Sequence, residues 1–165
     1  MILRDAVAMA AAVPPRGALL GLDLGTRTIG IAASDPDRRI ASPLRTIRRT
    51  KFTPDVAEVF ALMDERTVCG LVLGWPVEMS GAAGKRCQAT RGFAENMLRL
   101  RDMPVLLWDE RLSTSAVERM MVDEFDLSRG KRAAKVDAAA AAYILQGALD
   151  ALGRISAGAG GERAI

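Results

Sequence analysis

Short apolar runs near the start of the chain predict a group of three strands. Residues 19–24 (LLGLDL) and 29–34 (IGIAAS) are two such runs, separated by the turn residues GTRT at 25–28. Apolar runs on both sides of a glycine-containing turn are typical of a β-hairpin. Residues 43–49 (PLRTIRR) alternate apolar and polar side chains and carry three arginines, which indicates a strand at the edge of a sheet.

Helical and strand patterns alternate along the rest of the chain. After the helix-start residues Thr53 and Pro54, apolar residues recur at i, i+3, i+4 and i+7, which predicts a helix to about Arg66. The continuous apolar runs at 68–74 and 104–108 predict strands buried on both faces. Further helices are expected at residues 83–101, after the capping box of Ser115 and Glu118, and at 136–152, where Gly153 is the expected stop.

This order of elements predicts an α/β fold in one domain. Alternating strands and helices imply a mixed five-stranded sheet whose later strands are parallel, with helices on both faces. We expect the folded domain to span residues 18–153. A variable N-terminal extension (1–17), with a helical turn or two, precedes it, and a flexible tail (154–165) follows it.

The composition narrows the chemistry that this fold can carry. Half of the 165 residues are hydrophobic and 26% are charged, the balance of a globular protein, and no apolar run approaches the roughly 20 residues that span a membrane. The chain has no histidine, which removes histidine-based triads and most zinc sites. Catalysis would therefore rest on carboxylates, hydroxyls, lysine or arginine, with a metal ion if the substrate is an anion.

The two cysteines, Cys69 and Cys87, fall in a predicted buried strand and on the inner face of a predicted helix. Buried thiols are more common in such places than a disulfide or a metal pair. Reduced thiols and the lack of a convincing export signal predict a cytoplasmic protein.

Basic residues are concentrated in two segments, although the net charge is only +3. Residues 27–51 hold seven basic residues against two acids, and residues 128–135 (SRGKRAAK) hold four with no acid. Such clusters suit a polyanion like nucleic acid. A solvated surface without a partner is the alternative.

Carboxylates from three distant segments stand out by their places in the predicted elements. Asp23 lies among leucines in the first strand, where an unpaired charge is costly. Asp109 and Glu110 directly follow the strand at 104–108, and Asp137 lies in the first turn of the last helix, on the face of its small residues. Carboxylates brought together at one end of the sheet repel one another unless a cation such as Mg²⁺ holds them.

Each carboxylate also has a purely structural explanation. Asp23 could pair with Arg27 across the turn, and Asp109 could cap the turn that follows it. Asp137 could favour the N-terminus of its helix electrostatically. The three structural explanations are less convincing together than each is alone, because three carboxylates at neighbouring ends of the sheet would repel one another.

Four strings occur in this order along the chain: GLDLGTRTIGIAASD, LVLGWPVEMSGAAGKR, VLLWDERLSTSAVERMM and KVDAAAAAYILQGALD. In order and spacing they resemble the four motif blocks of the YqgF family, whose members are described as Holliday junction resolvases and as pre-16S rRNA nucleases. The resemblance covers residues 19–152. It implies a ribonuclease H-like fold, in agreement with the order of elements, and a metal-dependent endonuclease that hydrolyses phosphodiester bonds.

The resemblance also implies a site. Asp23, Glu110 and Asp137 would be the catalytic residues and would hold Mg²⁺ or Mn²⁺, two ions with substrate bound, one activating the attacking water and one steadying the leaving oxygen. Lys85 and Arg86, at a helix start, are placed to hold backbone phosphate. The expected substrate-binding residues are Arg27, Lys85, Arg86, Arg111 and, in a basic loop beside the last acid, Arg129, Lys131 and Arg132.

The implied partner is nucleic acid rather than a membrane. The resemblance favours structured RNA, at the 5′ end of pre-16S rRNA, over a four-way DNA junction. A junction would favour a homodimer over a monomer, because its two scissile strands are related by two-fold symmetry, and the helix of Met120 and Met121 is a candidate dimer face. Departures from the family pattern at Trp75, Glu78 and Ala138 bear on substrate details.

Rival classes of protein share parts of these motifs. DLGT at 23–26 resembles the first phosphate loop of actin-like kinases, which need two such domains where this chain has room for one. A Walker-type loop at AAGKR fails, because Met79 and Arg86 replace its glycine and its Ser/Thr. The third rival is a non-catalytic RNA-binding module, in which Trp75 could contact one base, although aromatic residues make up only 4% of the chain.

Overall fold

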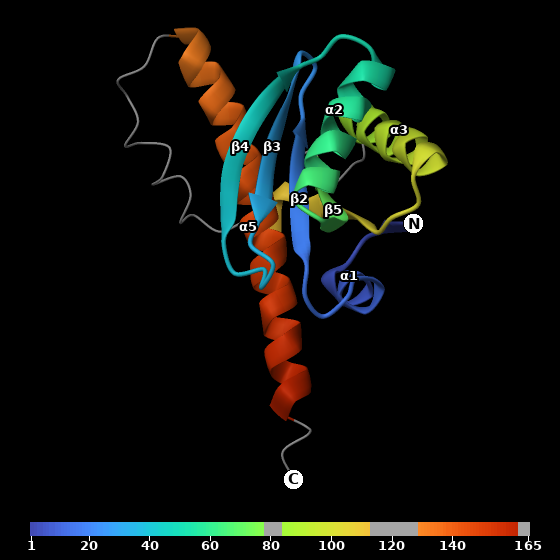
Figure 1. Cartoon of the computed structure of the whole chain (residues 1–165), viewed down its shortest axis with the longest axis vertical. Helices are drawn as coiled ribbons and strands as arrows, with labels where there is room; N and C mark the ends of the chain where they lie inside the picture. The colour runs from blue at the N-terminus through green and yellow to red at the C-terminus, as the bar shows by residue number, and fades with distance from the viewer. Residues whose placement is uncertain (78–83, 113–128, 162–165) are drawn as a thin grey trace.

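Six strands of the described residues form one sheet (Figure 1). The computed structural model describes residues 1–77, 84–112 and 129–161, with side chains at 134–158 in the last range. The strands are β1 Ile2–Leu3, β2 Ala18–Leu24, β3 Thr28–Ser34, β4 Ala41–Arg48, β5 Val68–Trp75 and β6 Val105–Asp109. They lie side by side in the order β1-β6-β5-β2-β3-β4.

The strand directions bring three strand ends to one edge of the sheet. β2 pairs antiparallel with β3, and β3 with β4, which forms the predicted hairpin and edge strand. β5 pairs parallel with β2, and β6 parallel with β5. The carboxyl ends of β2, β5 and β6 therefore lie along one edge, where sites form in open α/β sheets. The predicted mixed α/β sheet is confirmed.

The sheet has one strand more than the five predicted. Ile2 and Leu3 pair in parallel with Val105 and Leu106 of β6, and the amide of Val105 donates to the carbonyl of Met1 at 2.9 Å. A two-residue strand is too short to show an alternating pattern, so the sequence did not reveal it. β1 is followed by the helix α1 (Ala6–Ala12), which matches the expected helical turns near the start of the chain.

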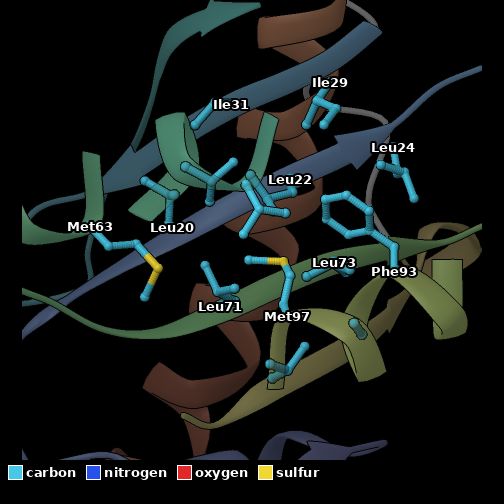
Figure 2. Close-up of a cluster of buried hydrophobic side chains, with 14 of the residues drawn as sticks. Leu20, Leu22, Leu24, Ile29, Ile31, Met63, Leu71, Leu73, Phe93 and Met97 are labelled. Atoms are coloured by element: carbon cyan, nitrogen blue, oxygen red, sulfur yellow. The ribbon is translucent and has the colours of Figure 1, made fainter. Parts of the chain in front are cut away.

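Two helices, α2 (Phe52–Glu65) and α3 (Lys85–Leu100), cover one face of the sheet. Figure 2 shows this core, in which alternate side chains of β2, β3 and β5 meet apolar side chains of the two helices. The predicted cap at Thr53 is wrong, because the helix begins at Phe52. The buried carboxylate of Asp55 accepts hydrogen bonds from the amide and hydroxyl of Thr50 at 3.0 to 3.2 Å and so fixes the start of α2.

The long helix α5 (Arg129–Gly161) and α1, which pack against each other, cover the opposite face. Small residues on α5 allow it to lie close to the sheet, and its larger apolar residues fill the space beyond them. This second core contains Leu19, Val72 and Leu106 from the sheet, Met9 from α1, and Ala141, Leu145 and Leu149 from α5. Helices on both faces were predicted, and this arrangement is confirmed.

Both predicted boundaries of the last helix are wrong. The basic segment that was expected to be a loop forms the first turns of α5, and the helix continues through Gly153 to Gly161. Apart from the neighbouring backbone of the helix itself, no atom lies within 4 Å of the position that a Cβ on Gly153 would take, so this glycine lies on an open side of the helix. A glycine inside a helix costs only about 1 kcal/mol relative to alanine, which the packing of the preceding turns on the sheet offsets.

The remaining predictions concern the helix after Ser115, the two cysteines and membrane-spanning segments. The helix after Ser115, with the candidate dimer face at Met120 and Met121, lies outside the described residues, as does Glu78. No disulfide links Cys69 and Cys87. Within the described ranges, no helix is both long and apolar enough to cross a membrane.

Candidate active site

Asp23 lies at the carboxyl end of β2, on the sheet face that α5 covers. Its neighbours Leu22 and Leu24 point into the opposite core, because successive side chains of a strand alternate between the faces. Asp23 itself is half-buried. In the hairpin it pairs directly with Gly30 of β3.

Asp137 reaches the same place from α5. The main-chain carbonyl of Asp137 occupies the space where Gly30 would carry a Cβ, so α5 touches the backbone of β3 at this point. The hydroxyl of Thr28, at the start of β3, donates a hydrogen bond to Oδ2 of Asp137 at 2.8 Å. Asp137 is therefore held beside Asp23 by a close helix–strand contact and by a side-chain hydrogen bond.

Glu110 comes from the other side of β2. It is the first residue of a short 3₁₀ helix, Glu110–Leu112, that follows β6. Its Oε1 lies 2.7 Å from the position that a Cβ on Gly74 of β5 would take. β5 lies between β6 and β2, so the missing side chain at Gly74 gives the Glu110 carboxylate room to lean toward Asp23.

Electrostatic interactions join the three carboxylates into one cluster. Burial raises the pKa of Asp23, the carboxylate of Asp137 raises it further, and the guanidinium of Arg86 opposes both effects. Burial likewise raises the pKa of Glu110, with Asp23 and Asp109 adding to it and Arg86 again opposing. Asp23 thus interacts with both of the other acids, and Arg86 is a cation that acts on Asp23 and Glu110.

Asp109 has a local structural partner, whereas Asp23 does not pair with Arg27. Among the described residues no ion pair joins Asp23 to Arg27, which is exposed in the β2–β3 turn. Asp109 does cap the turn that follows it, since its Oδ1 accepts from the amide of Arg111 at 2.9 Å. Asp109 also forms an ion pair with the Arg111 side chain at 2.7 Å, which lowers the pKa of Asp109. Asp109 is therefore a structural residue beside the cluster.

The expected phosphate-binding residues differ in where the structure places them. Lys85 and Arg86 are the first two residues of α3, both exposed, after the N-cap Gly84. The guanidinium of Arg111 is engaged by Asp109. Side chains at 129–133, which include Arg129, Lys131 and Arg132, lie outside the description, although their backbone belongs to α5.

Two residues of the site were missed by the sequence analysis. Thr28 orients Asp137, as described above, and Arg49 holds the β2–β3 turn, because its Nη1 donates to the carbonyl of Gly25 at 2.7 Å. GTRT contains two hydroxyls, at Thr26 and Thr28. The available signal for Thr28 was its position directly before the second buried strand of the hairpin, close to the acid that ends the first strand. Arg49 had no comparable signal among the many arginines of its segment.

The oxygen donors of the cluster suit Mg²⁺ or Mn²⁺. Within the described residues, no three acidic side chains lie close enough together to hold an ion by themselves. Enzymes commonly hold Mg²⁺ with one or two carboxylates and complete its shell with substrate phosphates and water. The interacting pairs, Asp23 with Asp137 and Asp23 with Glu110, fit that mode of binding, and a cation would relieve the repulsion in each pair.

The fold places the protein in the class of ribonuclease H-like α/β proteins. It is similar to the structure of RuvC from Thermus thermophilus, with a TM-score of 0.51 and 11% identity over 84% of this chain and 96% of that one. It is also similar to Ydc2, the yeast mitochondrial Holliday junction resolvase, with a TM-score of 0.50 and 13% identity over 92% of this chain and 86% of that one. At such identities the likeness concerns the fold alone.

The family follows from sequence. The model of the family described as "RuvX: Holliday junction resolvase" matches residues 17–151, so the chain belongs to this family. A protein of Rhodospirillum rubrum named "Putative pre-16S rRNA nuclease" is 66% identical over 87% of this chain and 89% of its own length. A protein of the same name from Phenylobacterium zucineum is 54% identical over 92% of this chain and 98% of its own length. RuvX is another name of the YqgF family, so the family resemblance inferred from the four motifs is confirmed.

Proposed function

We propose that this chain is a metal-dependent nuclease that hydrolyses phosphodiester bonds at the 5′ end of pre-16S rRNA. The observation that carries the proposal is the convergence of Asp23, Glu110 and Asp137 at one edge of the sheet, with Arg86 acting electrostatically on Asp23 and Glu110. The names of its relatives support rRNA as the substrate. A cytoplasmic location belongs to the proposal, because precursor rRNA is processed there.

The proposed metal ligands are Asp23, Glu110 and Asp137, which would hold divalent ions in pairs that share Asp23, with substrate phosphate and water completing each shell. A divalent ion, when bound, would lower the pKa of a water molecule and neutralise charge on the leaving oxygen. A cation held between Asp23 and its acidic neighbours would explain why a carboxylate is tolerated among leucines, since it offsets both the burial and the repulsion.

Other residues of the chain would bind and orient the substrate. Arg86 acts electrostatically on both Asp23 and Glu110. It could therefore contact a substrate phosphate that binds beside these two acids. Lys85 stands beside it at the N-terminus of α3, where the backbone amides also favour an anion. Thr28 keeps the Asp137 carboxylate in one orientation, as a partner behind a metal ligand does.

A four-way DNA junction is the second candidate substrate. The description of the family favours it, because its members are called Holliday junction resolvases. Symmetric cleavage of a junction needs two active sites related by a two-fold axis, so this version of the proposal also requires a homodimer.

A competition experiment separates the two substrates. End-labelled precursor 16S rRNA fragment and labelled four-way DNA junction are incubated with the protein in Mg²⁺, each with and without an excess of the other unlabelled. We expect cleavage of the RNA at a defined 5′ position and little inhibition by the junction. Preferential junction cleavage would favour resolvase activity, and binding without cleavage of either would favour a non-catalytic RNA-binding module.

A further inference from the structure

A second feature lies beside the candidate active site, on the β6 side of the sheet. It is a cleft of about 680 Å³ between the N-terminal segment, the ends of β5 and β6, and the first turns of α3. Its polar and aromatic lining includes Arg4, Trp75, Arg91, Trp108, Asp109 and Arg111. Asp109 lines this cleft and the next residue, Glu110, belongs to the acidic cluster, so the two features are neighbours.

The charged groups of the cleft are not equivalent. Arg91 forms an ion pair with Glu95 at 2.8 Å, and Arg111 forms one with Asp109 at 2.7 Å. The carboxylate of Asp5 accepts from the amide of Ala8 at 2.8 Å, where it caps α1. Within the described part of the chain, Arg4 has no acidic partner, and its side chain is exposed.

Arg4 is nevertheless held in place. Its guanidinium lies over the ring of Trp75, 5.5 Å from the ring centroid. Arg4 directly follows β1, and the pairing of β1 with β6 fixes the position of its backbone along the edge of the sheet. A guanidinium stacked on an aromatic ring keeps its planar set of N–H donors available for an oxyanion, and it loses little conformational freedom on binding.

Trp75 also connects Arg4 to the active-site edge. Trp75 is the last residue of β5 and pairs with Asp109, one residue before Glu110. The cation–π pair of Arg4 and Trp75 therefore lies at the same carboxyl edge of the sheet as the acidic cluster. A nucleic acid strand with its scissile bond at the cluster would carry its neighbouring backbone phosphates along this edge.

We propose that Arg4, supported by Trp75, binds a backbone phosphate of the substrate beside the bond to be cut. The proposal rests on the proposed nuclease function for the identity of the substrate. It makes the N-terminal segment, which precedes the residues 17–151 that match the family, part of the substrate-binding surface. Phosphate contacts of this kind position a substrate without reading its sequence.

The test is a binding measurement that needs no cleavage. The probe is a fluorescein-labelled RNA hairpin with a single-stranded 5′ extension, titrated in EDTA and followed by fluorescence anisotropy over a range of salt. For Arg4→Ala we expect a Kd about 3- to 10-fold higher at low salt, and a salt dependence reduced by about one phosphate contact. The Kd of Arg4→Lys should lie between those of Arg4→Ala and the wild type, because lysine keeps the charge but not the planar donors.

Matched variants separate this contact from a general effect of charge. Arg99→Ala removes an exposed arginine from the last turn of α3, at the opposite end of that helix, and should leave the Kd within about 2-fold of wild type. Trp75→Leu should weaken binding in the same direction as Arg4→Ala, whereas Trp75→Phe, which retains a ring, should not. Equal effects of Arg4→Ala and Arg99→Ala, or an unchanged Kd for Arg4→Ala, would overturn the proposal.

Cleavage is measured separately in Mg²⁺, so that the two proposals can fail independently. If the wild type cleaves RNA but Arg4→Ala binds as the wild type does, the Arg4 contact is refuted and the nuclease function stands. If the wild type does not cleave but Arg4→Ala binds more weakly, the contact stands and the nuclease function is refuted.

Discussion

The carbonyl of Asp137 lies against Gly30, in the space that a side chain on Gly30 would occupy. Gly30 pairs with Asp23 across the β-hairpin, so the same contact that seats α5 on the sheet brings the second acid beside the first. The site thus depends on a residue that has no side chain. Packing and function are coupled at this point, because a shift of α5 away from β3 would separate the two carboxylates.

This coupling predicts a large effect of a small substitution. Gly30→Ala should destabilise the protein by about 3 kcal/mol, the upper part of the range for overpacking, because the new methyl group meets main-chain atoms that cannot rotate away. Gly92→Ala is the matched control, since no atom lies within 4 Å of its Cβ position in α3, and it should stabilise by about 0.5–1 kcal/mol. Urea unfolding measures both, and a neutral Gly30→Ala would contradict the close contact.

Thr28 is predicted to act through Asp137. Thr28→Val removes the hydroxyl but keeps the shape, and we expect a cleavage rate about 10-fold lower together with a higher Mg²⁺ concentration for half-maximal activity. Thr28→Ser restores the hydroxyl and should recover both quantities. A purely structural role for Thr28 would lower stability without changing the dependence on Mg²⁺, and that outcome would refute the positioning role.

The acidic cluster should make the metal-free protein less stable as the pH rises. The pKa values of Asp23 and Glu110 are raised in the folded protein, so these groups cost no stability below their ordinary values near 4. The cost appears as the pH rises past those values and is complete above the raised ones. Asp23→Asn removes the central charge, so in EDTA its melting temperature should exceed that of the wild type by a margin that grows with pH.

Metal ions should reverse this difference. Mg²⁺ binds the folded wild type and stabilises it by mass action, whereas Asp23→Asn lacks the shared ligand. Differential scanning fluorimetry at several pH values, with EDTA and with Mg²⁺, measures both effects. A wild type that melts above Asp23→Asn in EDTA at neutral pH would mean that Asp23 is not repelled by its neighbours.

The sequence predicted those parts of the fold whose apolar pattern is long enough to read. The runs that became β2, β3, β5 and β6 were found because each contains at least five successive positions shaped by burial. β1 escaped detection because two residues carry no period, and its pairing depends on β6, which lies about a hundred residues away. The predicted end of the last helix at Gly153 was wrong. The helix propensity of glycine costs only about 1 kcal/mol, which is less than the free energy that α5 gains by packing on the sheet.

The sequence pointed to the three acids as candidates, but not to the contacts that organise them. Strand ends and the resemblance to a family pointed to Asp23, Glu110 and Asp137. The interaction of Arg86 with two of these acids depends on how α3 is placed over the sheet edge, which no local pattern encodes. The cation–π contact of Arg4 with Trp75 joins segments about seventy residues apart, so it also required the structure.

The central claim is that Asp23 is the shared carboxylate of a metal-dependent nuclease centre. Its most direct test is single-turnover cleavage of a 5′-labelled precursor 16S rRNA fragment by wild type and Asp23→Asn, in Mg²⁺ and in EDTA, with binding measured in parallel. We expect cleavage by the wild type only with the metal ion. Asp23→Asn should cleave more than about 100-fold more slowly, beyond the loss typical of a partner behind a metal ligand, and should bind as tightly as the wild type. Equal cleavage by the two proteins, or wild-type cleavage that persists in EDTA, would contradict the account.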